Sequence, residues 1–198
     1  MLFRSAALAS GLGPFVAGSH AGLFDAPSTH GLTGHLTVYT LEHLPEQLRA
    51  AAVLLVLTEV WRQAQAGDGQ RRMALIDEAW LLLDTPLAAE QLFRLAKSAR
   101  KHTLALALVS QDADDLLASR LGTAVAANAA TQVLMRQAPQ SLDQVADAFN
   151  LSAGETQFLA TAPRGNALVT GSDGVRTTVL SIADESEFDL LRTGISAH

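Results

Sequence analysis

The chain has 198 residues, of which 48% are hydrophobic and 17% charged, so it fits one domain, or one domain with an appendage, with a sizeable core, and the composition argues against global disorder. The net charge of -6 argues against a protein that coats nucleic acids, although it leaves room for a local basic patch. The sequence contains no cysteine, which excludes disulfides and cysteine metal sites.

The N-terminal residues 1–35 are predicted to be largely irregular. Residues 2–10 are typical of a short helix, and Gly11–Gly34 is rich in Gly, Ser, Thr, His and Pro, which indicates loops around a brief strand at Leu23–Asp25. The longest apolar run elsewhere, Ala50–Leu57, is far shorter than the roughly 20 residues of a membrane span. We therefore expect no segment that crosses a bilayer.

From residue 36 onwards, strand patterns alternate with helix patterns. The expected strands are Leu36–Leu41, 72–77, Thr103–Val109 and Thr131–Arg136, followed by a hairpin of 167–170 and 175–182. The expected helices are Pro45–Ala64, Pro86–Lys101, 112–119, 121–128, Pro139–Phe149, one that starts with a capping box at Ser152–Glu155, and 184–192. This alternation predicts an α/β fold of three layers, with a mostly parallel sheet, helices on both faces and a C-terminal hairpin.

Two adjacent carboxylates, Asp77 and Glu78, directly follow a buried strand. Parallel strands end at the edge where α/β proteins collect their ligands, and Asp and Glu are also common at helix N-termini. Gln111 ends the next strand and Arg136 a third, so polar groups are expected at one sheet edge. Phosphoryl transfer to water requires a group that holds the metal, a group that orients the water, a group that senses the phosphate, and a cation.

These residues lie in motifs whose order and spacing resemble the C-terminal part of conjugative and type IV secretion ATPases of the VirB/TraC kind. These ATPases belong to the HerA/FtsK branch of RecA-like P-loop motors. The motifs are Ala74–Trp80, Ala99–His102, Val109–Asp112, Asn128–Gln137, Leu151–Glu155 and Pro163–Val169, with a looser match over 23–60. The resemblance implies that residues 36–198 form the C-terminal part of a RecA-like core and that the irregular segment 1–35 precedes it.

The resemblance also implies roles for individual residues. Asp77 helps to hold Mg²⁺ through water, Glu78 polarises the hydrolytic water, and Gln111 senses the γ-phosphate. Arg100, Lys101 and Arg164 match basic positions that reach a nucleotide in the same or a neighbouring subunit. Alternatively, Arg100 and Lys101 form a solvated helix end and Arg164 belongs to a turn. For Arg136 a structural role is favoured.

The chain departs from the family at the phosphate-binding loop. Such ATPases need G-x-x-x-x-G-K-[ST], and the two lysines here, Lys97 and Lys101, do not follow a glycine. We therefore expect ATP and Mg²⁺, the family's cofactors, not to bind tightly to this chain alone, and its ATP hydrolysis to be negligible. A cut piece, a split gene product and a degenerate remnant all fit this pattern.

Three functions remain open from the sequence. The chain is half of the ATPase motor of a conjugation or secretion machine, a non-catalytic RecA-like module that docks on such an ATPase, or a fragment of a HerA/FtsK-type DNA translocase. The long helix after the carboxylates, the strand around Thr131 and the acidic charge favour the first two. The expected partners are other subunits of the machine, including copies in a ring. The expected location is the cytoplasm, at the inner face of the inner membrane, with membrane association only through partners.

Overall fold

A computed structural model describes residues 34–41, 43–83, 85–111 and 113–187, together with the isolated positions 13, 16, 18 and 21. The chain divides into two units, Met1–Thr40 and Leu41–His198, and every element named below belongs to the second. The predicted helix at 2–10 and strand at 23–25 lie outside the described residues. The domain boundary predicted between residues 35 and 36 stays a prediction.

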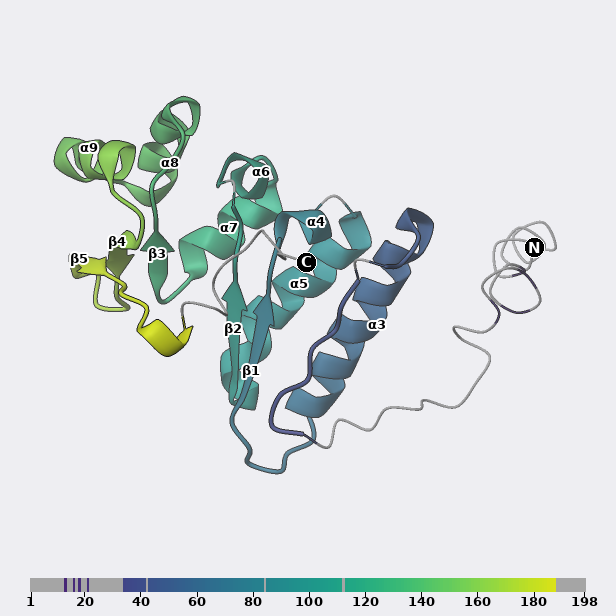
Figure 1. Cartoon of the computed structure of the whole chain (residues 1–198). Helices are drawn as coiled ribbons and strands as arrows, with labels where there is room; N and C mark the ends of the chain where they lie inside the picture. The colour runs from purple at the N-terminus through teal and green to yellow at the C-terminus, as the bar shows by residue number, and fades with distance from the viewer. Residues whose placement is uncertain are drawn as a thin grey trace. The chain divides into compact units, whose positions relative to one another are not determined.

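Two parallel strands, β1 (Arg72–Ile76) and β2 (Leu104–Leu108), form the first sheet. Their register pairs Arg72 with Leu104 and Ile76 with Leu108, so both strands end at the same edge. Helices α3 (Glu46–Ala64) and α5 (Pro86–Ser98) pack together and cover one face of this sheet (Figure 1). Leu57, Leu92 and Leu104 are among the buried residues of the core between them. Burial of this apolar layer holds the edge of the sheet in place.

A second core lies around β3 (Gln132–Leu134), which pairs antiparallel with β4 (Asn166–Thr170), which in turn pairs with β5 (Arg176–Leu180). Val145 and Leu159 are fully buried there. The helices that contribute to this core are α6 (Ala113–Leu117), α7 (Arg120–Asn128), α8 (Leu142–Phe149) and α9 (Ala153–Thr161). The short helix α4 (Trp80–Leu83) instead contributes Leu82 to the first core.

Most predicted elements are confirmed. The α/β class, the parallel strand pair and the C-terminal antiparallel hairpin are present, and Ser152 and Glu155 form the predicted capping box. Two predicted helices contain 3-10 turns, η1 (Ala99–His102) after α5 and η2 (Pro139–Ser141) before α8. Short 3-10 turns are common at helix ends because they satisfy terminal backbone groups.

Two expectations about strands were wrong. Leu36–Leu41 is not a strand, and Leu36 and Val38 are largely exposed, because strand-forming side chains alone do not fix an extended segment without a paired neighbour. The strand at 131–136 does not join the sheet of β1 and β2. It is shortened to β3 and lies in a separate sheet, because its hydrogen bonds go to β4.

Among the described residues, no helix combines the length and apolar character needed to cross a membrane.

Candidate functional site: the carboxylate edge

The turn that carries Asp77 and Glu78 is fastened to the end of β2. The backbone N–H of Val109 donates to the Ile76 carbonyl at 2.9 Å, and the N–H of Ala79 donates to the Val109 carbonyl at 2.9 Å. Ala79 is fully buried, so burial of this side chain also anchors the segment between β1 and α4. The two carboxylates are therefore presented where β1 and β2 end together. We call this place the carboxylate edge and define it by Asp77, Glu78, Trp80 and Gln111.

Glu78 is held in an uncommon backbone conformation. Its φ is 51°, in the left-handed region that non-glycine residues seldom adopt, and its backbone N–H donates to Asp77 Oδ1 at 3.0 Å. The left-handed residue turns the chain between β1 and the start of α4. Such strained residues occur often at functional sites.

Both carboxylate oxygens of Glu78 accept hydrogen bonds from side chains. Trp80 Nε1 donates to Oε2 at 2.6 Å, and Gln111 Nε2 donates to Oε1. Glu78 and Gln111 lie 33 positions apart in the sequence, so the parallel pairing of the strands brings them together. The predicted proximity of Glu78 and Gln111 is therefore present.

Asp77 lies beside Glu78 with an exposed side chain. A carboxylate oxygen is a suitable donor for Mg²⁺, either directly or through water, and Mg²⁺ at phosphate sites commonly uses one or two carboxylates plus substrate phosphates. Among the described residues, no group of three or more His, Cys, Asp or Glu side chains forms a candidate metal cage. Asp77 thus fits an ion that takes most of its ligands from water and phosphate.

Arg100 and Lys101 lie at the opposite edge of the same sheet. They belong to η1, which leads into the first residue of β2, whereas Gln111 follows its last residue. A strand of five residues spans about 16 Å at 3.3 Å per residue. The structure therefore does not bring these two cations to Glu78 within one chain.

Electrostatics at that opposite edge separate the arginines into paired and unpaired positions. The Arg72 guanidinium bonds Asp68 at 2.5 Å and, with the backbone N–H of Gln70, lowers the pKa of the Asp68 carboxyl to about 2. Asp68 in turn raises the pKa of Arg72. Arg72 is thus neutralised locally, whereas the neighbouring Arg71, Arg100 and Lys101 have exposed side chains.

Arg164 stands in the turn before β4, next to Gly165. Gly165 has a φ of 81°, and a Cβ there would lie 2.7 Å from the Ser181 carbonyl oxygen, so only glycine fits this turn without a shift. This geometry agrees with the alternative that Arg164 and Gly165 belong to a turn. No contact in the described residues links Arg164 to Glu78.

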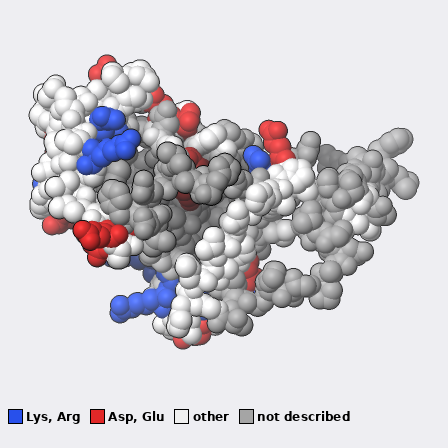
Figure 2. All heavy atoms as spheres, viewed as in Figure 1, with Lys and Arg blue, Asp and Glu red and all other residues white. Residues whose placement is uncertain are grey.

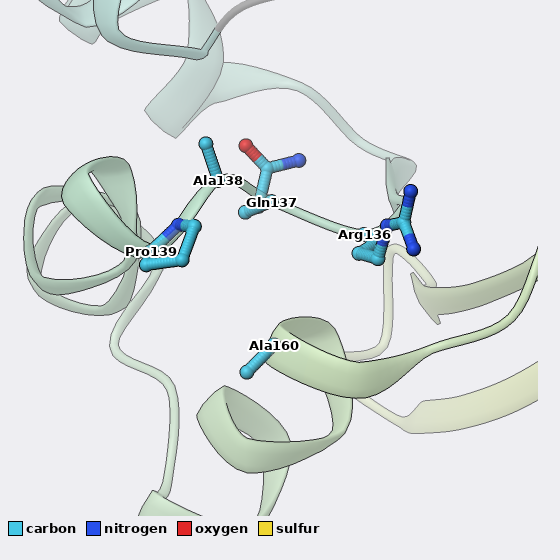
Figure 3. A pocket seen from close by; sticks show the side chains of 5 residues that line it. All are labelled: Arg136, Gln137, Ala138, Pro139 and Ala160. Carbon is cyan, nitrogen blue, oxygen red and sulfur yellow. The ribbon is translucent and has the colours of Figure 1, made fainter.

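Arg136 borders an open hollow of about 410 Å³ away from the carboxylates. Arg136 to Pro139 come from the segment after β3, and Ala160 comes from α9 (Figure 3). The backbone N–H of Gln137 donates to the Leu159 carbonyl at 3.1 Å, which ties this segment to α9. The lining contains one charged side chain, so the hollow is not a strong candidate for a catalytic site.

Trp80 is the residue of this edge that the sequence interpretation missed. The sequence gives it no role beyond the motif Ala74–Trp80, but its indole N–H donates to the carboxylate two residues earlier. The signal available in the sequence was chemical, because a half-buried indole N–H usually finds an acceptor and Glu78 is close in the chain.

The described part of the surface shows no broad basic stripe on the face in Figure 2, where Lys and Arg occur in separate places with Asp and Glu nearby. A protein that tracks along DNA usually gathers its cations on one face.

Residues 25–172 match the family described as the TraG P-loop domain. Among solved structures the chain is similar to VirB4 of Thermoanaerobacter pseudethanolicus, with a TM-score of 0.80 and 27% sequence identity, over 92% of this chain and 51% of that one. The chain therefore spans about half the length of that VirB4 structure. No curated protein matches the chain.

Proposed function

Because this chain belongs to the TraG P-loop domain family and its resemblance to type IV secretion ATPases is thereby confirmed, we propose that it supplies the carboxylate half of an ATP-hydrolysing site. The machine in which it acts is a conjugation or type IV secretion system. The observation that carries the proposal is the contact between Glu78 and Gln111 at the ends of two adjacent parallel strands.

Each residue of the carboxylate edge has a proposed task. Asp77 holds the water shell of Mg²⁺, Glu78 orients and polarises the attacking water, and Gln111 responds to the terminal phosphate. When bound, ATP would supply the phosphoryl group, and Mg²⁺ would supply positive charge that offsets the negative charge of the phosphates. The oxygen donors at Asp77 and Glu78 and the amide at Gln111 are of the types that these tasks require.

The phosphate-binding half of the site comes from outside these 198 residues. The sequence contains no G-x-x-x-x-G-K-[ST], so the nest of backbone N–H groups and the lysine that grip the β- and γ-phosphates must be supplied by another segment. We propose that residues 36–198 form the C-terminal part of a RecA-like core to which that segment adds, with residues 1–35 ahead of it.

Arg100 and Lys101 are assigned to contacts between subunits, because η1 lies before β2 and Gln111 lies after it. Arg164 is assigned to such a contact or to the turn before β4. In a ring of copies, a cation at one edge of a subunit can reach a nucleotide bound to its neighbour. The proposed location is the cytoplasmic side of the inner membrane, where other subunits of the machine hold the chain.

The first test measures phosphate release at millimolar ATP and Mg²⁺, together with calorimetry of nucleotide binding. We expect the chain alone to release no more phosphate than its Glu78→Gln variant. With a loop-bearing segment joined upstream, hydrolysis should appear, and Glu78→Gln should reduce kcat by about 100-fold or more, as expected for loss of a general base.

Glu90→Gln is the matched control, because Glu90 pairs with Arg94 on the exposed side of α5 and the substitution removes the same charge. Robust turnover by the chain alone, or an equal loss in both variants, contradicts the proposal. The non-catalytic docking module is the second candidate, and the coding sequence directly upstream distinguishes it: an in-frame loop segment supports the motor, and an independent start supports the module.

A further inference from the structure

Trp80 and Gln111 hold the same carboxylate from two different elements. Trp80 is the first residue of α4 and half-buried, and its Nε1 lies 2.6 Å from Glu78 Oε2. Gln111 follows β2, is exposed, and donates to the other oxygen, Oε1. The proposed function uses Glu78 and Gln111 but gives no task to Trp80.

The two donors differ in chemistry. An indole N–H can only donate and does not titrate, so it favours a carboxylate at every pH at which the protein is folded. A side-chain amide donates and accepts, so it can exchange one partner for another. Trp80 is also half-buried, whereas Gln111 is exposed, so its amide is open to a competing partner from solvent.

We propose that Trp80 is a positioning residue: its indole N–H fixes the Glu78 carboxylate whether or not Gln111 holds the other oxygen. This inference rests on the proposed function, because it matters for catalysis only if Glu78 orients the attacking water. It adds a division of labour: Trp80 keeps the Glu78 carboxylate in place, while the Gln111 amide exchanges Glu78 for the terminal phosphate.

The geometry also explains why a hydrogen bond from Trp80 reaches Glu78 at all. The left-handed conformation of Glu78 lies in the turn of residues 77–79, and the N–H of Leu81 donates to the Glu78 carbonyl at 3.0 Å. The side chains of Glu78 and Trp80, two positions apart, therefore face one another instead of diverging as they would along a helix.

The first test observes the hydrogen bond in the chain alone by heteronuclear NMR of ¹⁵N-labelled tryptophan. The sequence has two tryptophans, so Trp61→Phe assigns both indole signals and leaves Trp80 alone. We expect the Trp80 indole proton to move upfield and to exchange with solvent about tenfold faster in Glu78→Ala, since a hydrogen bond to a charged group is lost. Glu78→Gln, which keeps an acceptor oxygen, should shift it part of the way.

Gln111→Ala is the decisive variant in this experiment. The Trp80 signal should stay at its wild-type position, because its bond does not depend on the amide. A signal that ignores Glu78→Ala, or that collapses in Gln111→Ala, overturns the inference without touching the proposed function. Trp61, whose ring packs edge-on against His102 at 4.8 Å between centroids, is the internal control for general loss of structure.

The second test uses the ATPase with the phosphate-binding segment joined upstream. Trp80→Phe retains a ring and removes the donor, so kcat should fall about tenfold while KM for ATP stays within about twofold. Trp61→Phe should change neither. An unchanged kcat in Trp80→Phe, with active wild type, refutes the positioning role alone. If the wild type itself hydrolyses no ATP, the proposed function fails and this inference fails with it.

Discussion

Left-handed backbone occurs at three non-glycine residues in the described part of the chain: Glu78, Thr103 and Asn150, with φ of 51°, 56° and 50°. Thr103 and Asn150 are the residues at which η1 and α8 end, and Glu78 lies in the turn between β1 and α4. Asparagine tolerates this conformation, and at Glu78 it brings the carboxylate to Trp80 and Gln111. Thr103 has no such role, and its branched Cβ makes the same conformation unfavourable.

Thr103→Gly should therefore stabilise the chain. Relief of the left-handed strain favours the variant by about 1–2 kcal/mol, and the greater freedom of glycine in the unfolded chain offsets about 0.5–1 kcal/mol of this. We expect the free energy of unfolding in urea to rise by about 0.5–1 kcal/mol. Thr178→Gly, at an ordinary position of β5, should lower it instead. Equal losses in both variants would show that residue 103 is not strained.

At this scale the sequence could predict part of the candidate site. The proximity of Glu78 and Gln111 was foreseen because parallel strands bring their carboxyl ends to one edge, whereas the roles of Asp77, Glu78 and Gln111 stay predictions. Trp80 could not be foreseen from spacing, because its contact depends on the left-handed residue before it. The distance of Arg100 from Gln111 was available from the sequence, because Arg100 precedes the strand Leu104–Leu108 and Gln111 follows it.

The start of α9 joins three elements through a few polar side chains. The backbone N–H of Ser152 donates to Glu155 Oε2 at 2.7 Å, and the backbone N–H of Glu155 donates to Ser152 Oγ at 3.3 Å. From β5, Arg176 donates to Glu155 at 3.1 Å and to the Asn150 carbonyl at 2.9 Å. These bonds satisfy the exposed backbone groups where α8 ends and α9 begins.

Stability should depend on pH through Glu155. The Ser152 backbone N–H, then its hydroxyl and Arg176, hold the pKa of Glu155 below its usual 4.5. A depressed carboxyl pKa stabilises the fold above the unfolded-state pKa, and this contribution is lost as pH falls through the folded-state pKa. Glu155→Gln should therefore lower the free energy of unfolding more at pH 7 than at pH 3.

Urea titrations at both pH values measure this difference. Other carboxylates with lowered pKa, such as Glu59, which Arg62 and Gln63 bring to about 2, contribute to acid unfolding in both proteins and cancel in the comparison. Glu90→Gln, in an exposed pair with Arg94, is the control and should show little change at either pH. If Glu155→Gln lowered the free energy of unfolding equally at both pH values, the charge of the Glu155 carboxylate would not be the cause.

Most element positions were predictable because the chain signals its own boundaries. Pro86 opens α5, and Ser152 with Glu155 caps α9. The strand expected at Leu36–Leu41 failed because β-propensity describes a side chain that fits a sheet, and the described residues provide no ladder for it. Whether a strand pattern becomes a strand depends on its neighbours, which a local window cannot contain.

On the scale of the whole molecule, the described residues of the unit Leu41–His198 form two sheets of two and three strands. Parallel sheets are normally buried on both faces, yet on the face of β1 away from α3 and α5 the side chains of Met73 and Leu75 are 67% and 63% exposed. The fold class was predictable from alternating strands and helices. The division into two sheets was not, because it depends on which strands are at hand to pair.

This exposed face should make the chain alone associate with itself. Replacing Met73 and Leu75 by lysine should lower light scattering at high concentration and leave the unfolding midpoint nearly unchanged, since both side chains are already largely in water. Leu87→Lys, at a residue that is 57% exposed on α5, is the control and should affect scattering less. A large loss of stability in the double variant would mean that the face is covered.

The bonds of Arg176 also set an order of events in synthesis. Phe149 and Asn150 leave the ribosome 27 and 26 residues before Arg176. Their carbonyls can therefore accept the hydrogen bonds of Arg176 only after α9 and β4 have been synthesised. Contacts between distant residues form late, after local helices. We therefore expect the backbone at the end of α8 to remain without these hydrogen bonds during translation until β5, which carries Arg176, has been made.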